Sequence, residues 1–190
     1  MRYSAEHKAQ TREKLLHSSG AIAKQGGFAS AGVDGLMKAI GLTGGAFYGH
    51  FASKNDLFAA IVERELSHSL QRLGDNPEAR RDKLQRCLNR YLSMAHVRQP
   101  DTGCAIPTLG AEIARADIAV REQAEHWLLQ LQQAWAAVLD DDALAWAILA
   151  QCVGALLLAR MLATSGCQEQ VLSASKDLLG SVLASRPATG

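Results

Sequence analysis

Apolar residues recur at helical spacing along almost the whole chain. In the segment 33–40, Val33, Leu36, Met37 and Ile40 follow an i, i+3, i+4, i+7 pattern, which places them on one face of a helix. Runs of Val, Ile and Thr that would indicate strands are absent from the sequence. The pattern predicts an all-α protein of about nine helices, near residues 8–25, 33–40, 44–50, 53–73, 78–95, 104–115, 117–139, 142–164 and 168–185.

Glycines and capping residues mark the ends of these helices. Gly41 follows the second helix and suits a left-handed C-terminal cap. Thr43 and Ser53 are placed to cap the two helices that come next. Asp117 and the run 140–142 favour helix starts, because carboxylates suit the positive end of the helix dipole. We expect the fourth helix to end at the run 74–77.

The segment 41–58, GLTGGAFYGHFASKNDLF, concentrates four glycines in nine residues. Each glycine inside a helix costs roughly 0.5–1 kcal/mol relative to alanine, so a sharp turn or the close approach of another molecule is expected here. The second helix, a three-residue turn and the third helix make a helix-turn-helix plan. In that plan the N-terminal residues of the later helix meet base edges in the major groove.

The residues around this turn have side chains suited to DNA. Gly44, Gly45 and Ala46 are small, so we expect the backbone to approach DNA closely. Tyr48 offers a hydroxyl and His50 a ring N–H, and Lys54 falls in the first turn of the next helix, where phosphate is favoured. A plain helical hairpin with a tight glycine turn and a half-buried Tyr48 is the alternative.

The charge is divided unevenly along the chain. The whole protein has a net charge of +1, but residues 1–54 carry seven basic and three acidic residues, a net charge of +4, and the remainder carries −3. A basic N-terminal third indicates an anionic partner at that end, although ordinary solvated faces give the same signal. With 48% apolar and 21% charged residues, the composition is typical of a soluble globular protein.

Together with the preceding segment GGFASAGVDGLMKAI, the glycine-rich stretch resembles the DNA-binding domain of the TetR family of bacterial transcriptional regulators. The matching positions cover about residues 8–62. The resemblance implies a cytoplasmic homodimer that binds a palindromic operator in double-stranded DNA, most often as a repressor, and is released by a small-molecule effector. It also implies a DNA-binding domain over 1–54 and a ligand-binding and dimerisation domain over 55–190.

The resemblance carries roles to individual positions. The family often has Lys or Ser where Gly44 stands, and Thr followed by Ser or Thr where Ala31 and Gly32 stand. Ser30 is therefore a candidate substitute as a phosphate contact or cap, and Gly49 takes the place of a side chain that is usual in the family. The expected DNA-binding residues are Thr43, Gly44, Gly45, Ala46, Tyr48, Gly49, His50, Lys54 and Ser30.

Cys104 is the candidate for a sensing thiol. The segment from Gly103 to Arg115 resembles one branch of the family, in which some members use this cysteine to sense electrophiles or oxidants. A position near a helix N-terminus also lowers the pKa of a thiol. The alternative is that Cys104 is a small packed residue at the helix start. Cys87, Cys152 and Cys167 lie on or beside apolar helical faces, and we expect them to be buried.

An effector pocket and a dimer surface are expected in the C-terminal two thirds. An apolar lining with a few polar points is typical of a ligand pocket. The last two long helices, 142–164 and 168–185, carry small residues and more apolar area than one side can hide, which indicates a dimer surface rather than an internal hairpin alone. The candidate ligand-binding residues are Tyr91, Met94, Cys104, Trp127, Leu131, Trp135 and Met161.

No catalytic motif is present in the sequence. It has no nucleophile elbow, no glycine-rich phosphate loop and no HExxH zinc motif, so we expect neither an enzyme nor a metal or other cofactor. The polar N-terminus and the interrupted apolar run 143–163 favour a cytoplasmic protein with no membrane partner and a buried helix at 143–163. The alternative function is a helical small-molecule carrier or thiol enzyme that never meets DNA.

Overall fold

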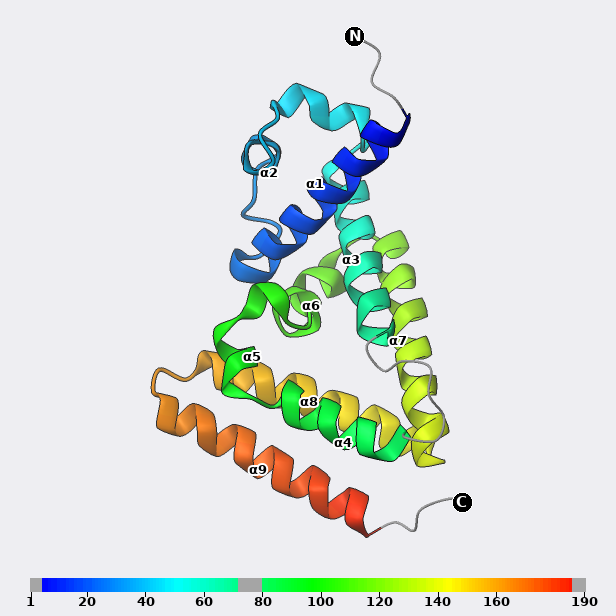
Figure 1. Cartoon of the computed structure of the whole chain (residues 1–190), viewed down its shortest axis with the longest axis vertical. Coiled ribbons are helices and arrows are strands. Elements are labelled where there is room, and N and C mark those ends of the chain that lie inside the picture. Colours follow the sequence, from blue (N-terminus) through cyan, green and yellow to red (C-terminus); the bar gives the residue numbers. More distant parts are fainter. Residues whose placement is uncertain (1–4, 72–79, 186–190) are drawn as a thin grey trace. The chain divides into compact units, whose positions relative to one another are not determined.

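The computed structural model describes residues 5–71 and 80–185, and every regular element in these ranges is a helix (Figure 1). The predicted all-α class is therefore confirmed. The chain divides into two compact units, and each unit is assembled from two separate stretches of sequence. The first unit combines the chain up to Ser67 with Pro100–Glu125, and the second combines His68–Gln99 with the chain from His126 onward.

The elements divide between the two units as follows. The first unit contains α1 (Ala5–Gly26), α2 (Val33–Ala39), the 3₁₀ helix η1 (Gly44–Gly49), most of α3 (Lys54–Gln71), the 3₁₀ helix η2 (Pro100–Thr102), α6 (Ile106–Arg115) and the start of α7 (Ile118–Leu139). The second unit contains α4 (Arg80–Tyr91), α5 (Met94–Arg98), most of α7, α8 (Asp142–Met161) and α9 (Ser165–Ala184).

The core of the first unit is made by the apolar positions that the sequence pattern selects. Leu36 and Met37 of α2 are almost fully buried, as are Phe47 and Phe51, which are four residues apart at and after η1. The apolar side of α3 is buried as predicted along Leu57, Phe58, Ile61, Val62 and Leu66. The small helices α2 and η1 are thus held in place by aromatic and aliphatic packing rather than by their own length.

A charged pair lies inside this apolar core. The Nζ atom of Lys24 lies 2.7 Å from Oε2 of Glu65, and both residues are at most 9% exposed. Lys24 also donates to the carbonyl oxygen of Gly103 at 3.2 Å, and Arg64 donates to Oε1 of Glu65 at 3.0 Å. The pair therefore joins α1 to α3 and to the segment that leads into α6.

A carboxylate from α6 holds the loop that follows α1. The two oxygens of Glu112 accept hydrogen bonds from the backbone N–H groups of Phe28 and Ala29, at 2.9 Å and 2.7 Å. These amides lie beyond the end of α1 and have no helical partner of their own. Because α6 supplies their acceptor, residues 100–125 belong to the same packed unit as the helix-turn-helix. The division predicted after residue 54 remains a prediction about function.

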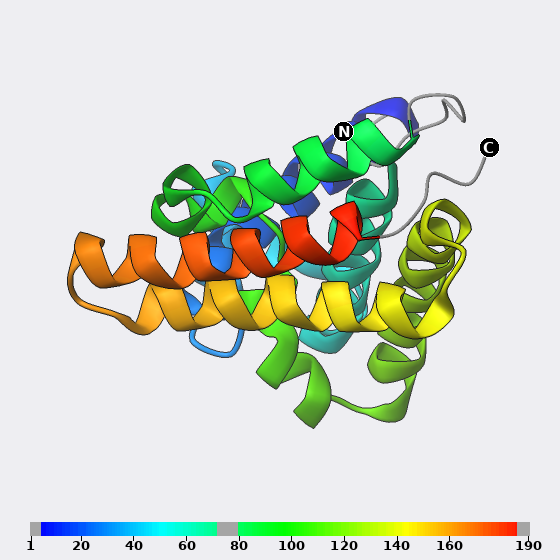
Figure 2. The same ribbon diagram turned by 90° about the horizontal axis from the view of Figure 1, so that it is seen from below.

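The second unit packs α8 against α9 as an antiparallel hairpin, with α4 and α5 on it (Figure 2). The cap predicted at Ser53 is confirmed, since its hydroxyl accepts from the N–H of Asp56. The helix starts predicted at Asp117 and at 140–142 are also confirmed, and there Asp117 accepts from the N–H of Val120 and Asp141 from that of Leu144. The predicted cap at Thr43 is wrong, because this residue occupies the N-cap position of η1 but makes no side-chain capping bond.

The helix predicted over 78–95 is wrong in extent. In the structure α4 ends at Tyr91, and α5 begins at Met94 after Ser93, whose hydroxyl accepts from the N–H of His96. Ser93 interrupts the helix because its side chain offers the backbone a local hydrogen bond in place of the helical one. The predicted start at 78, Leu73 and the predicted helix end at 74–77 lie outside the described residues.

The apolar helix α8 is long and apolar enough to cross a membrane by length and composition, and it is the one such helix in the part of the chain that the structure describes. Only 33% of its most apolar window is buried. One face, which includes Ala145, Ile148, Cys152, Ala155 and Leu156, packs inside the second unit. The predicted buried helix is therefore confirmed for one face, while the other face is exposed.

Removal of Lys24 tests the buried pair. We expect Lys24→Met to lower the free energy of unfolding by about 3 kcal/mol, because the buried carboxylate of Glu65 loses the ammonium group that lies 2.7 Å from it. Urea unfolding of the purified protein measures this change. Lys14→Met, an exposed position on the same helix, is the matched control and should change stability by less than about 0.5 kcal/mol. Equal stabilities of the two variants would contradict the expected contribution of the Lys24–Glu65 ion pair to the free energy of unfolding.

Candidate nucleic-acid interface

The turn between α2 and η1 is fixed by backbone hydrogen bonds. The N–H of Leu42 donates to the carbonyl of Met37, and the N–H of Gly41 donates to that of Lys38, each at 3.0 Å. This pair of bonds is the Schellman arrangement, which needs a left-handed residue after the helix. Gly41 has φ +76°, so the predicted role of this glycine is confirmed.

The helix that follows is a 3₁₀ helix rather than the α-helix that its place in the motif suggests. It spans Gly44–Gly49, and its hydrogen bonds include those from Ala46 N–H to Thr43 and from His50 N–H to Phe47. Six residues that contain three glycines form few α-helical bonds, and short 3₁₀ segments are the usual result. With three residues per turn, Gly44 and Phe47 share the inner side, whereas Gly45 and Tyr48 share the outer side.

Gly44 has a local reason to be glycine. A Cβ atom added at this position would collide with Oδ1 of Asp34, so the carboxylate of α2 fills the space of the missing side chain. The sequence pattern predicts only the approach of DNA as a reason for the small size of Gly44 and does not reveal the contact with Asp34. The signal available was an acidic residue in the first turn of a helix that ends shortly before the turn.

Gly45 and Gly49 lie in open space. A Cβ atom at either position would have no neighbour within 4 Å, and neither residue has a positive φ angle. Packing inside the chain therefore gives no reason for glycine at these two positions. Both residues are exposed, as are Thr43 and Tyr48, the latter by 70%. The outer surface of η1 is consequently flat apart from one projecting tyrosine ring.

Ala46 and His50 are half-buried beside this surface. The Nδ1 atom of His50 is buried and has no hydrogen-bond partner in the described residues. Burial lowers the pKa of His50 from its ordinary value of 6.5, and the positive charges of Lys8, Arg12 and His7 lower it further. At neutral pH the ring is therefore neutral, and any contact it makes to phosphate is a hydrogen bond rather than an ion pair.

Lys54 and Ser30 have partners inside the protein. The Nζ atom of Lys54 donates to the carbonyl of Ala29 at 3.1 Å and lies 4.8 Å from the ring centroid of Phe28. This contact fixes the ammonium group at the start of α3. Ser30 donates to the carbonyl oxygens of Gly26 and Gly27, so it caps the end of α1 and not the start of α2. Its role as a phosphate contact remains a prediction.

The residues predicted to bind an effector fall into three groups. Leu131 and Trp135 are buried in the core of the second unit, and Tyr91 and Met94 pack against that core. Trp127 is half-buried and Met161 is 71% exposed, so Met161 points away from the core. Cys104 is half-buried in the first unit. The structure thus gathers four of the seven residues in one core.

The remaining cysteines differ from the expected burial. Cys152 is 2% exposed, which confirms the prediction for this residue, but Cys87 is half-buried and Cys167 is exposed. Cys167 lies in the first turn of α9. None of the four forms a disulfide.

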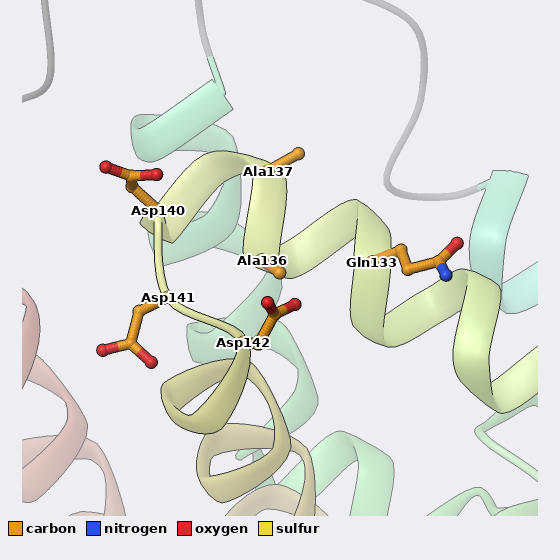
Figure 3. A pocket seen from close by; sticks show the side chains of 6 residues that line it. All are labelled: Gln133, Ala136, Ala137, Asp140, Asp141 and Asp142. Carbon is orange, nitrogen blue, oxygen red and sulfur yellow. The ribbon is translucent and has the colours of Figure 1, made fainter.

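An open pocket of about 340 Å³ lies where α7 meets α8 (Figure 3). Its lining consists of Gln133, Ala136, Ala137, Asp140, Asp141 and Asp142. Two of the three carboxylates already serve the backbone or a neighbour, since Asp141 caps α8 and Asp142 accepts from Gln132. None of the predicted effector residues lines this pocket.

The first unit has the geometry of a helix-turn-helix DNA-binding domain: a short supporting helix, a three-residue turn and an exposed second helix beside a lysine. Residues 15–61 match the family described as bacterial regulatory proteins, tetR family. The HTH-type transcriptional regulator YvdT of Bacillus subtilis (strain 168) is 34% identical over 61 residues, which are 32% of this chain and 31% of that protein. The match thus spans about a third of the length of that relative.

Solved structures share the fold over nearly the whole chain. The reduced form of E. coli NemR has a TM-score of 0.75 at 22% identity, over 91% of this chain and 97% of the other. A TetR regulator from Chloroflexus aurantiacus has a TM-score of 0.76 at 21% identity, over 95% and 98% of the two chains. One from Legionella pneumophila has a TM-score of 0.74 at 20% identity, over 96% and 99%. Residues 15–61 therefore match the DNA-binding domain of TetR-type regulators, and the chain as a whole shares the fold of the solved TetR-type structures.

A double-mutant cycle tests the contact between Gly44 and Asp34. Gly44→Ala should lower the free energy of unfolding more in the wild-type background than in the Asp34→Ala background, by about 1 kcal/mol, because the new methyl group displaces the carboxylate. Chemical denaturation of the four proteins gives this coupling energy. Gly45→Ala is the matched control, with open space around it, and should show no coupling to Asp34. Equal coupling at both glycines would contradict the assignment.

Proposed function

We propose that this protein is a ligand-responsive repressor that binds a palindromic operator as a homodimer and leaves DNA when a small molecule binds the helical body. The observation that carries the proposal is the outer face of η1, where Thr43, Gly45, Tyr48 and Gly49 are all exposed and the two glycines have open space around them. A surface kept clear of its own side chains, with Tyr48 at its centre and Lys54 fixed nearby, suits the floor of the major groove.

The proposed roles divide between positioning and reading. Lys54 and the hydroxyl of Tyr48 contact phosphates and set the register of η1 on the duplex, which needs no sequence information. Thr43, Gly45 and Ala46 lie at the first turn of η1 and approach base edges. The hydroxyl of Thr43 is well suited to this, since it makes no capping bond inside the protein. Where only glycine faces a base, recognition depends on the shape of the DNA and on contact with the methyl group of thymine.

The homodimer is proposed through α8 and α9. Their internal sides are buried, yet a second apolar face stays exposed, with Trp146, Leu157, Leu158 and Leu178 each at least 43% exposed. Ala143, Ala147 and Ala150 are exposed on the same helix, and their small size allows a second helix to approach closely. Regulators of this family bind DNA and dimerise. The second copy of this chain is accordingly the occupant we assign to this face.

The effector is proposed to bind within the second unit, beside Trp135. This residue is 7% exposed, and its indole Nε1–H has no acceptor in the described residues. A buried donor without a partner costs about 1–3 kcal/mol, and a ligand with an oxygen or nitrogen acceptor would remove that cost. Tyr91, Met94 and Leu131 belong to the same core. The ligand class is therefore a mostly apolar small molecule with an acceptor atom.

Cys104 remains a candidate for a second type of response, to electrophiles or oxidants. It follows Gly103, whose carbonyl oxygen accepts a hydrogen bond from Lys24. A change in the volume or charge of this thiol would act next to the buried pair of the DNA-binding unit. We propose a cytoplasmic location, where DNA is accessible and the thiol stays reduced.

Selection of bound fragments from random duplex DNA tests the function. We expect a palindrome with half-sites one helical turn apart, and binding that weakens steeply with salt. Lys54→Ala should weaken binding to all sequences alike and reduce the slope of log Kd against log salt by about 0.9. Arg98→Ala, an exposed cation of the second unit, is the control and should keep the wild-type slope. No enriched sequence and no salt-sensitive complex would refute the proposal.

A charge placed on the exposed face of α8 tests the dimer. Leu158→Glu places two carboxylates in one two-fold interface, so we expect monomers at concentrations where the wild type sediments as a dimer, with a dimer Kd raised by at least about 30-fold. Leu129→Glu, on α7 with 40% exposure, is the matched control and should leave the dimer intact. Analytical ultracentrifugation distinguishes the two, and a dimeric Leu158→Glu protein would exclude this face.

A further inference from the structure

A second group of cations lies beside the end of η1, on an element outside the helix-turn-helix. The guanidinium carbon of Arg12, on α1, lies 4.7 Å from the ring centroid of Phe51, the residue that follows His50. Phe51 is 6% exposed, whereas Arg12 is exposed, so the ring fixes the position of the guanidinium while its N–H groups face solvent. Such stacking leaves the fork of donors available for an anion.

Lys8 lies on the same face of α1 as Arg12, because the two residues are four apart. The positive charges of Lys8 and Arg12 both act on His50, which places them within electrostatic reach of the end of η1. In the described part of the chain neither residue forms an ion pair. The nearby carboxylate of Glu13 is directed to Arg64 instead, at 3.0 Å. Among the residues whose side chains the structure describes, no carboxylate pairs with the positive charge on this face of α1.

The cation group is continuous with the surface that faces DNA. The rings of Tyr48 and Phe47 meet edge to face with centroids 5.3 Å apart, and those of Phe47 and Phe51 are 6.0 Å apart. Arg12 thus stands at one end of a row of aromatic rings whose other end is the exposed Tyr48. Figure 1 shows the first turns of α1 beside the chain that follows η1.

Lys54 is held at a different place, over Phe28, which follows the far end of α1. From Arg12 to the end of α1 at Gly26 the helix rises on the order of 20 Å. Phosphates of one strand follow each other at about 3.4 Å along the axis, so cations so far apart serve different phosphates.

We propose that Lys8 and Arg12 form a second phosphate-binding surface, which holds the DNA backbone beside the C-terminal end of η1 and away from the phosphate contacted by Lys54. The inference rests on the proposed function, since its partner is the duplex that η1 reads. The surface adds affinity and fixes the angle of η1 in the groove, while base selection stays with η1 itself.

Salt titrations with the full-length protein and the selected operator test this surface. Lys8→Ala and Arg12→Ala should each reduce the slope of log Kd against log salt by about 0.9, and the double variant by about 1.8, because each removes one phosphate contact. The bases preferred at each operator position should not change. Fluorescence anisotropy at four salt concentrations gives the slopes.

Lys14→Ala is the matched control, since Lys14 is an exposed cation on another side of the same helix. It should keep the wild-type slope. Arg12→Ala also removes a contact to Phe51, so its effect on binding includes any effect on folding. Lys8 is exposed, so Lys8→Ala measures the loss of charge with little effect on folding, and thermal unfolding verifies the fold of each variant. Replacing the contacted phosphate by a neutral methylphosphonate should weaken the binding of the wild-type protein to the duplex. The same replacement should leave the binding of the double variant unchanged.

The outcomes separate the two proposals. A wild-type protein with no salt-sensitive binding to any duplex refutes the proposed function. Wild-type binding with a steep slope, together with unchanged slopes in Lys8→Ala and Arg12→Ala, overturns the second surface and leaves the function standing. A slope that falls equally in Lys14→Ala also overturns it, because general charge on α1 would then explain the effect.

Discussion

The ammonium group of Lys24 has to be neutralised inside the protein, and the first unit is organised around that requirement. A lysine that is 5% exposed cannot keep its charge without a close anion and further acceptors. Glu65 from α3 supplies the anion, and the carbonyl of Gly103 supplies the further acceptor. Three stretches that are distant in sequence therefore meet at one point. The helices α2 and η1 are too short to be stable alone, so the helix-turn-helix depends on its packing against the rest of this unit.

The same unit shows two different uses of an absent side chain. At Gly44 the space is taken by Asp34, so glycine is required by the packing of α2 against η1. At Gly45 and Gly49 the space is empty, so packing inside the chain gives no reason for glycine there. Only these two glycines belong to the recognition surface that we propose. Within the glycine-rich segment, Gly44 thus allows α2 to pack against η1, whereas Gly45 and Gly49 leave the outer face of η1 without side chains beside Tyr48.

Much of the fold follows from short-range rules, which is why the sequence predicts it well. The apolar stripe of α2, the left-handed Gly41 and the caps at Ser53, Asp117 and Asp141 depend on neighbours within four residues. The same rules were wrong at Thr43, where six residues rich in glycine form a 3₁₀ helix whose N-cap side chain makes no bond. They also missed the break at Ser93, because an apolar pattern continues on both sides of it.

Contacts between distant residues were the part that the sequence could not give. Nothing in the pattern pairs Lys24 with Glu65 or Glu112 with Phe28, because no local rule relates residues 41 or 84 positions apart. The candidate DNA contacts were easier, since a family motif carries them, but their internal partners were not visible. Lys54 and Ser30 each bond to backbone carbonyls, and Arg12 stacks on the ring of Phe51, a long-range contact that the linear motif does not reveal.

Glu112 accepts hydrogen bonds from two consecutive backbone amides, and these two bonds link α6 to the loop that follows α1. A single hydrogen bond acts as a pivot about which two elements can rotate, whereas a carboxylate with both oxygens engaged resists rotation as well as separation. The two hydrogen bonds therefore couple the orientation of α6 to that of the loop at Phe28, and hence to the end of α1.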